Sequence, residues 1–320
     1  YEIYQCDWSS DVCSSDLAFA QSFPDRPVRV IVPYPPGGST DLVGRILGEG
    51  ATESLGQSVV IDNRAGAGGT IGTVSVARSA PDGYTLIECT VGTCAIVPAL
   101  MSNIGYDINK DFVPVMLIGG VANVFLVTPT FPPKTIKELV ALAKQRPGEI
   151  VFGSGGIGNS PHMTVELLKY RAKIDMLHVP YKGSGPALID AAGGQIQMLV
   201  ENEPAVVQHV KSKRLRALAG TGPKRSAALA DIPTMIEQGY DDFVVEAWFG
   251  VLAPAKTPRA VVDKLNASFN TALQNPRTRQ RLEEVSVNIA GGPPEKFAAH
   301  IKAESDKWSS VIKANNIKPE

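Results

Sequence analysis

The amino-acid sequence predicts an α/β fold made of two units, each a mostly parallel sheet flanked by helices. Three observations predict it. Short apolar segments typical of strands alternate with segments whose apolar residues follow helical spacing, which is the order of parallel sheets with helices on their faces. The alternation begins a second time near residue 136, after a long strand-like segment. A length of 320 residues suits about two domains.

The first unit is expected to begin with the order β–α–β–α–β. Strands are predicted at residues 28–32, 59–62 and 85–89, and helices at 40–54 and 71–80. The first helix has Leu42, Val43, Ile46 and Leu47 at helical spacing, and Pro81-Asp82-Gly83 ends the second helix.

The second unit repeats this pattern. Helices are predicted at residues 136–145, 161–170 and 186–192, and strands at 150–152, 177–179, 195–200 and 215–219. Two long strand-like segments, 112–128 and 243–252, are expected to cross between the units near Val121 and Ala247, and helices at 258–274 and 294–312 follow. We therefore expect a discontinuous first domain, residues 21–121 and 247–320, and a second domain, residues 122–246, with a ligand cleft between them.

The first twenty residues are expected to lie outside the fold. Residues 1–17, YEIYQCDWSSDVCSSDL, resemble the translation of a sequencing-library adapter. We therefore expect them to be disordered; a natural polar tail is the alternative. Ala18-Phe19-Ala20 matches the small-residue pattern before a signal-peptidase cut, so we interpret residues 18–20 as the end of a signal peptide and expect an exported protein.

Composition excludes several classes of function. The formal charge of −1 becomes +3 when residues 1–17 are left out, and no cluster of Lys or Arg indicates nucleic-acid binding. No apolar run reaches the roughly 18 residues that a membrane-spanning helix needs. After residue 17 the only cysteines are Cys89 and Cys94. We interpret them as free core thiols, and a local disulfide is the alternative.

Three glycine-rich loops connect a predicted strand to a predicted helix. They are Pro35-Pro36-Gly37-Gly38-Ser39-Thr40-Asp41, residues 153–161 and residues 181–186. Ligands of open α/β sheets bind beyond the carboxyl ends of the strands, and glycines with free N–H groups at a helix N-terminus favour an anion. The three loops together predict an anion-binding cleft, although each one alone is also typical of an ordinary turn.

Particular residues of these loops are expected to cap helices or face the cleft. Ser39 or Thr40 can cap one helix or donate a hydroxyl, Asn159 or Ser160 can cap another helix, and Pro161 suits the first helical turn. Asp41 suits the first turn of its helix as an acid that favours the helix dipole. Lys182 is the one cation that is well placed to contact an anion in the cleft. The alternative is that Lys182 is an ordinary loop lysine exposed to solvent.

The sequence contains no recognisable catalytic or metal-binding pattern. Gly153-x-Gly155-x-x-Gly158 matches the dinucleotide fingerprint. That fingerprint expects an acidic residue after the second strand, whereas Asp175 comes before the second strand. His162, His178, His209 and His300 are scattered without metal spacing, and Ser154, Ser160 and Ser184 have no recognisable base partner. Trp248 and Phe249 are expected either to form an apolar cleft wall or to pack in the core.

A series of motifs from Phe23 to the C-terminus resembles one protein family. The motifs include VRVIVPYPPGGSTD, NRAGAGGTIG, YDINKDFVPV, GSGGIGNSPHM, HVPYKGSGPALIDAAGGQIQ and WFGVLAPAKTP. In this order they resemble the solute-binding receptors of tripartite tricarboxylate transporters, also called Bug receptors. The resemblance implies a periplasmic, two-domain Venus-flytrap protein of the type II binding-protein fold. Such a receptor binds a small organic carboxylate and passes it to a permease with one large and one small subunit.

The resemblance also implies which residues bind the ligand. The expected site consists of Pro36, Gly37, Gly38, Ser39, Thr40, Asp41, Ser154, Gly155, Gly156, Gly158, Asn159, Ser160, His162, Tyr181, Lys182, Gly183 and Glu201. The backbone and the hydroxyls of Ser39, Thr40, Ser154 and Ser160 would hold a carboxylate. No catalytic residue, metal ligand or cofactor is expected, and the protein is expected to be a monomeric receptor and not an enzyme.

Two segments depart from the family pattern. The family often has His-Ala-Ile-Asn-Pro where this chain has Cys94-Ala95-Ile96-Val97-Pro98, and an aromatic-Asp pair where this chain has Val200-Glu201. Both lie near predicted strand ends, so pocket size and polarity are expected to differ from the common type. Two other functions stay open: an α/β enzyme that binds a dinucleotide or phosphate, and a sensory domain that presents its ligand to a membrane kinase.

Overall fold

The computed structural model describes residues 23–314 and 317–318. The segments interpreted as adapter and signal-peptide end, residues 1–17 and 18–20, lie outside the described residues. No helix within the described part is long and apolar enough to span a membrane.

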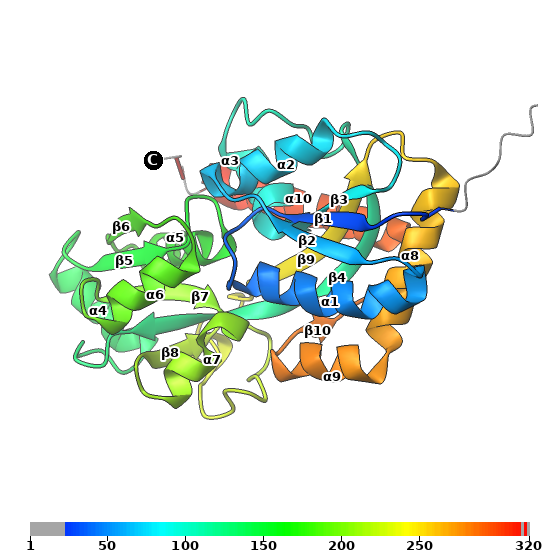
Figure 1. Ribbon diagram of the computed structural model, residues 1–320. Coiled ribbons are helices and arrows are strands. Elements are labelled where there is room, and N and C mark those ends of the chain that lie inside the picture. The colour runs from blue at the N-terminus through cyan, green and yellow to red at the C-terminus, as the bar shows by residue number, and fades with distance from the viewer. Residues whose placement is uncertain (1–22, 315–316, 319–320) are drawn as a thin grey trace, which may run out of the picture.

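One mixed sheet organises the fold (Figure 1). Its main path is β2–β1–β3–β9–β4–β7–β5–β6, and β8 and β10 also pair with β4. The strands are β1 Val28–Val32, β2 Val59–Asn63, β3 Thr85–Thr90, β4 Phe112–Val127, β5 Val151–Ser154, β6 Leu177–Pro180, β7 Met198–Asn202, β8 Arg216–Gly220, β9 Glu246–Pro254 and β10 Asn288–Ile289.

Two lobes share this sheet. We call β1–β3, β9 and β10 with their helices the first lobe, and β5–β8 with theirs the second lobe; β4 runs through both. The parallel pairs are β1 with β2 and β3, and β5 with β6 and β7. β4 pairs antiparallel with β9, β7 and β8. It is antiparallel to β9 because β4 leads into the second lobe and β9 leads back. The predicted α/β fold is confirmed, and its sheet is mixed where the crossing strands join it.

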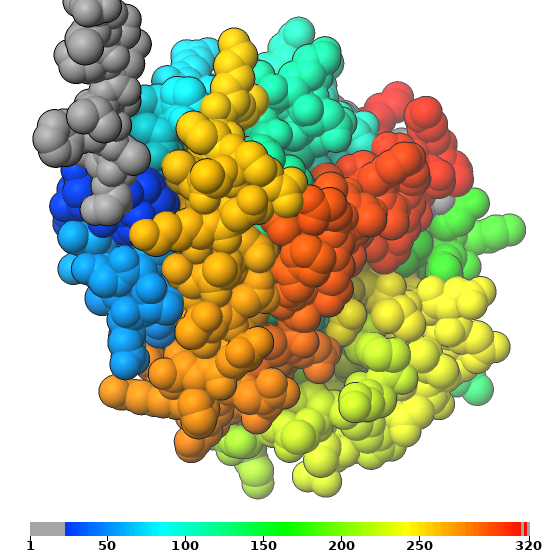
Figure 2. Space-filling model, turned by 90° about the vertical axis from the view of Figure 1, so that its right-hand side faces the viewer, coloured from blue at the N-terminus to red at the C-terminus, as the bar shows by residue number. Residues whose placement is uncertain are grey.

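Helices cover both faces of the sheet. They are α1 Ser39–Leu55, α2 Thr70–Ala77, α3 Val97–Leu100, α4 Ile136–Gln145, α5 Ser160–Ala172, α6 Ser184–Ala192, α7 Glu203–Lys211, α8 Arg259–Gln274, α9 Pro276–Glu284 and α10 Pro294–Ala314. Helix α1 contacts α8 and α9, so segments from the N-terminal and C-terminal parts of the chain pack together in the first lobe. Figure 2 shows these N-terminal segments, in blue, against the C-terminal helices, in orange.

Most elements lie within a few residues of their predicted positions. The sequence pattern does not predict α7 or α9, because each of these short helices buries only two or three side chains. It also misses the π-helical turn Gly92–Ile96 that leads into α3, since every residue from 92 to 96 is buried and no amphipathic spacing results. The domain boundaries at residues 121 and 247 stay a prediction.

The interpretation of Cys89 and Cys94 as free thiols is wrong, because the two residues form a disulfide. Cys89 lies in β3, and Cys94 lies in the π-helical turn that follows it. The chain reverses between them and brings their Cα atoms to 6.2 Å, which is within the normal range for a disulfide. The spacing of five residues alone does not reveal this reversal.

The first lobe packs tightly where β9 meets α10. Gly250 of β9 lies against the ring of Phe297, which is fully buried, and the Trp248 ring meets the Phe297 ring edge to face at 5.8 Å. A side chain at residue 250 would overlap the Phe297 ring, so the glycine permits the close contact of strand and helix.

Replacing Gly250 by alanine is expected to lower the free energy of unfolding by about 1–3 kcal/mol, the usual cost of overpacking a core. The matched control is Gly220→Ala in β8, because a Cβ at Gly220 meets no atom within 4 Å. Urea unfolding of both variants measures the difference. Equal losses of stability would contradict this description of the packing.

Candidate ligand-binding site

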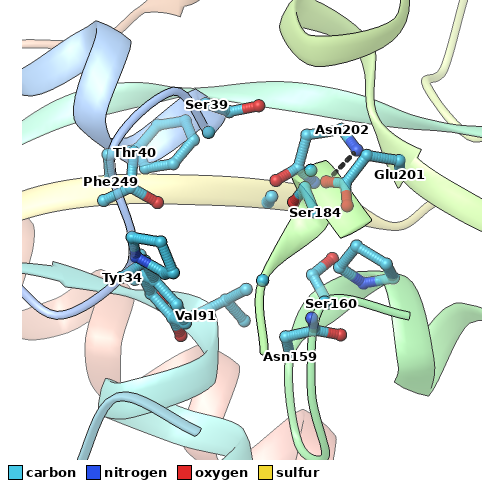
Figure 3. Close-up of a pocket in the computed structure, with 18 of the residues that line it drawn as sticks. Tyr34, Ser39, Thr40, Val91, Asn159, Ser160, Ser184, Glu201, Asn202 and Phe249 are labelled. Carbon is cyan, nitrogen blue, oxygen red and sulfur yellow. Dashed lines mark hydrogen bonds between the residues drawn. The ribbon is translucent and has the colours of Figure 1, made fainter. Parts of the chain in front are cut away.

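Two connected cavities lie between the lobes. The inner pocket, of about 110 Å³, is lined from the first lobe by Ser39, Thr40 and Phe249 and from the second by Ser184, Glu201 and Asn202 (Figure 3). The outer groove, of about 640 Å³, is lined by Gly68, Ile104, Ile157 and Lys182 among others. Tyr34, Pro35, Gly155 and Gly183 line both. The inner pocket is well below the size of about 300–1,000 Å³ that is usual for drug-sized ligands, so it suits a small molecule.

The N-terminus of α1 faces the inner pocket without a capping side chain. Its N-cap is Gly38, in an extended conformation, so Ser39 and Thr40 do not cap the helix, and the alternative that they donate a hydroxyl stays a prediction. Both are already inside the first turn, where N–H groups have no partner within the helix. Ser39 and Thr40 are buried and line the pocket, and the Ser39 hydroxyl has no hydrogen-bond partner. This helix end can therefore donate to an anion.

Asp41 does not line either cavity; it holds the loop that precedes α1. Its carboxylate accepts hydrogen bonds from the Gly37 N–H at 3.0 Å, from Arg45 Nε at 3.1 Å and from Asn63 Nδ2 at 2.9 Å. Burial raises the pKa of Asp41, but these hydrogen bonds outweigh it, so the pKa lies below its ordinary value. Asp41 therefore stays ionised and fixes the loop, and its charge is paired with Arg45.

Two helices of the second lobe also begin at the inner pocket. Asn159 caps α5 and accepts a hydrogen bond from the His162 N–H at 2.8 Å, as the sequence predicts. Helix α6 begins after Gly183, which has φ of 115° and provides no side chain to cap it. Ser184 and Gly185 of its first turn line the pocket. Uncapped helix N-termini therefore approach one small pocket from both lobes.

Asn123 of β4 orders the floor of the second lobe beside the pocket. It is fully buried and donates through Nδ2 to Ser160 Oγ at 2.6 Å and to Thr164 Oγ1 at 2.7 Å. Its Oδ1 accepts a hydrogen bond from Asn202 Nδ2 at 2.5 Å. Asn123 thus fixes two pocket-lining residues, Ser160 and Asn202, at set positions.

The inner pocket contains one acid and no basic side chain among the described residues. Glu201 is 2% exposed; its Oε1 accepts the Asn202 N–H at 2.8 Å, and its Oε2 has no hydrogen-bond partner. Burial raises the pKa of Glu201, and hydrogen bonds from Ser184 and Asn202 offset only part of this effect. Tyr34 stays neutral because burial raises its pKa further above 10.

The structure divides the predicted site residues into three groups. The inner pocket includes Pro36, Gly38, Ser39, Thr40, Gly155, Asn159, Ser160, Gly183 and Glu201. The outer groove includes Gly155, Gly156, Tyr181, Lys182 and Gly183. Neither cavity is lined by Gly37, Asp41, Ser154, Gly158 or His162. Lys182, the predicted cation, therefore lines the outer groove and not the inner pocket.

His162 and Ser154 support the second loop from behind. His162 stacks on His178 at 4.2 Å and accepts the Gly158 N–H at 3.3 Å. Burial first, and then His178 and Lys169, lower the pKa of His162 to about 3, so its ring is neutral. Ser154 Oγ lies 2.8 Å from His178 Nε2, a partner that the sequence does not reveal. Ser154 is only 1% exposed, so a substrate cannot reach this pair as it stands.

Several pocket residues were missed by reasoning from the sequence. They are Tyr34, Thr90, Val91, Ser184 and Asn202. Ser184 and Asn202 carry a recognisable signal, since each directly adjoins the start of a helix that follows a strand. Phe249 lines the pocket as an apolar wall, whereas Trp248 packs in the opposite direction, against Phe297 and His300. No group of His, Cys, Asp or Glu in the described chain could hold a metal ion.

A family model described as the tripartite tricarboxylate transporter family receptor matches residues 43–317. The chain belongs to this family. The match covers both lobes and confirms the resemblance that the motifs indicate.

Solved structures similar to this receptor come from the same class. The periplasmic binding protein BugD is 35% identical, with a TM-score of 0.88, over 93% of this chain and 100% of its own. Rpa4515 of R. palustris, solved with adipate, is 36% identical, with a TM-score of 0.89 and the same coverage. MatC from Rhodopseudomonas palustris, solved with bound malate, is 33% identical, with a TM-score of 0.87, over 91% of this chain and 100% of its own.

Replacing Asp41 by asparagine is expected to lower the free energy of unfolding by about 1–3 kcal/mol at neutral pH, since hydrogen bonds to a buried charge are lost. The folded-state pKa of Asp41 is lowered, so its contribution is present above the unfolded pKa and is lost as pH falls through the folded one. The difference between wild type and variant should therefore close in acid. Urea unfolding at neutral and acidic pH measures it.

Asp263→Asn is the matched control for this variant. Asp263 also pairs with an arginine four residues away, Arg259, but both side chains are more than half exposed. Its replacement should change stability by less than about 1 kcal/mol, as is usual for surface pairs. A loss at Asp41 no larger than that at Asp263 would show that Asp41 does not hold the loop.

Proposed function

We propose that this receptor captures a small organic carboxylate in the inner pocket and delivers it to a tripartite tricarboxylate-type permease. The observation that carries the proposal is the convergence of two uncapped helix N-termini, those of α1 and α6, on one pocket between the lobes. Free backbone N–H groups and the positive end of a helix dipole favour an anion without a fixed cation.

The carboxylate class is supported by what similar receptors hold. Rpa4515 was solved with adipate and MatC with malate, and both ligands are small organic acids. In this chain Ser39, Thr40 and Ser160 add hydroxyls at the pocket wall. The ligand carboxylate would accept hydrogen bonds from the α1 N-terminus and from these hydroxyls.

The pocket location supports a receptor whose domains close around the ligand. The proposed domains are residues 21–121 with 247–320, and residues 122–246, joined by the crossing strands. Two glycines allow close contact across the cleft: a Cβ at Gly183 would lie 2.8 Å from Pro35 Cγ, and one at Gly68 would lie 2.9 Å from the Ile157 carbonyl oxygen. The present arrangement corresponds to a closed cleft.

The remaining parts of the proposal concern compartment and partners. Membership of the receptor family supports a periplasmic protein that serves a permease. We propose further that it acts as a monomer and that the permease has one large and one small subunit. The Cys89–Cys94 disulfide suits an oxidising compartment such as the periplasm. We propose that the protein is not an enzyme and uses no cofactor, in keeping with a pocket of neutral donors.

A thermal-shift screen tests the binding function. The chain from Gln21 would be unfolded and refolded to remove carried-over ligand, then mixed with mono-, di- and tricarboxylates, aromatic acids and NAD. A ligand at a hundred times its Kd should stabilise the folded protein by about 2.7 kcal/mol. Stabilisation by one class of carboxylate supports the proposal. Stabilisation by NAD alone would overturn it in favour of a nucleotide-binding enzyme.

Replacing Gly183 by alanine is expected to raise the Kd of a carboxylate ligand by at least about tenfold, equivalent to about 1.4 kcal/mol. The added methyl group would press on Pro35 and keep the lobes from closing. The control is Gly56→Ala at the C-terminus of α1, where φ is also positive, at 69°, but no atom lies within 4 Å. Calorimetric titration of both variants measures the effect. Unchanged affinity in Gly183→Ala would argue against closure at this contact.

A further inference from the structure

Two residues that line the inner pocket from different lobes each carry a buried polar atom without a hydrogen-bond partner. Ser39 Oγ belongs to the first turn of α1, and Glu201 Oε2 belongs to the end of β7. Ser39 is 4% exposed and Glu201 is 2% exposed, and both line the pocket. Figure 3 shows them on opposite sides of the cavity. Because buried polar atoms are nearly always paired, this pair indicates where a ligand binds.

Ser39 Oγ and Glu201 Oε2 suit different chemical groups of a ligand. Ser39 stands beside uncapped N–H groups, and its hydroxyl can donate to an anion together with them. An ionised Glu201 can only accept hydrogen bonds, and its Oε1 already accepts one from the Asn202 N–H. The Ser184 hydroxyl lies close enough to contribute a hydrogen bond to Glu201, and Oε2, which has no partner in the structure, can accept a further hydrogen bond from a donor that the ligand brings.

Charge balance decides which donor suits Glu201 best. Within the described chain no Lys, Arg or His lines the inner pocket, so the Glu201 carboxylate has no fixed counter-ion there. A second ligand carboxylate beside it would add like-charge repulsion in a buried site, whereas an ammonium group would form a charge-assisted hydrogen bond. Burial raises the pKa of Glu201, and a neighbouring ammonium would favour its ionised form again.

We propose that the ligand is an amino carboxylate, with its carboxylate at Ser39 and the α1 N-terminus and its ammonium group donating to Glu201 Oε2. This inference rests on the proposed function, because it assumes that the inner pocket binds a carboxylate. In this binding mode Glu201 selects for the amino group, whereas Ser39 binds the carboxylate of any acid that enters the pocket.

Matched ligand series test the proposal on the wild-type protein first. Succinate, malate and aspartate share four carbons and differ only in carrying hydrogen, hydroxyl or ammonium at one position. Propionate, lactate and alanine form the three-carbon series, and glutarate, 2-hydroxyglutarate and glutamate the five-carbon series. Calorimetric titration should show that, in the series that binds best, the amino member binds at least about tenfold more tightly than the unsubstituted acid.

Two variants then separate the roles of the residues. Glu201→Gln has the same shape without the charge, and it should remove most of the preference for the amino member. Ser39→Ala should weaken all three members of a series by a similar factor and leave the preference in place. Thermal unfolding without ligand checks that each variant is folded, and the wild-type comparison stands even if a variant is not.

The outcomes distinguish this inference from the proposed function. If acids bind but the unsubstituted or hydroxyl member binds as tightly as the amino member, the amino-carboxylate assignment is overturned and carboxylate binding stands. The same holds if Glu201→Gln leaves the preference unchanged. If no acid of any series or of the wider carboxylate screen binds to the wild-type protein, both the inference and the proposed function fall.

Discussion

The uncapped first turn of α1 is the constraint on which the rest of the site depends. Gly38 provides no side chain for the free N–H groups, so an acceptor must come from outside the helix. Asp41 sits in the same turn, yet its carboxylate is occupied by Gly37, Arg45 and Asn63. The acid that would repel an anion is thus paired and turned away from the pocket, and it keeps the loop in a shape that leaves the N–H groups available.

The arrangement of the sheet brings a second uncapped helix N-terminus, that of α6, to the same pocket. The antiparallel pair of β4 and β9 connects the lobes, and β4 continues beside β7. The start of α6 and the end of β7 therefore lie opposite α1. Glycines such as Gly183 allow the loops to meet, because any larger residue would contact Pro35. Each lobe provides part of the pocket wall, so in the proposed receptor ligand binding would be coupled to closure of the lobes.

Local features of the sequence predict much of this site, and long-range packing determines the rest. Glycine loops between strands and helices indicate Ser39, Thr40 and Ser160, and these residues line the inner pocket, because parallel strands end at one edge of a sheet. The sequence cannot show that Asp41 and His162 turn behind their loops, since that depends on Asn63 and His178. The pairing of Asn123 with Asn202 joins residues 79 apart, and no local pattern reveals it. The disulfide depends on a chain reversal that spacing does not encode.

A crystal structure with the tightest-binding carboxylate tests most directly whether the α1 N-terminus is the anion site. We expect a ligand carboxylate within hydrogen-bond distance of the backbone N–H groups of Ser39 and Thr40 and of the Ser39 hydroxyl. The helix ends of both lobes should contact the same ligand. A carboxylate bound instead to Lys182 in the outer groove, with the inner pocket free of ligand, would contradict the assignment.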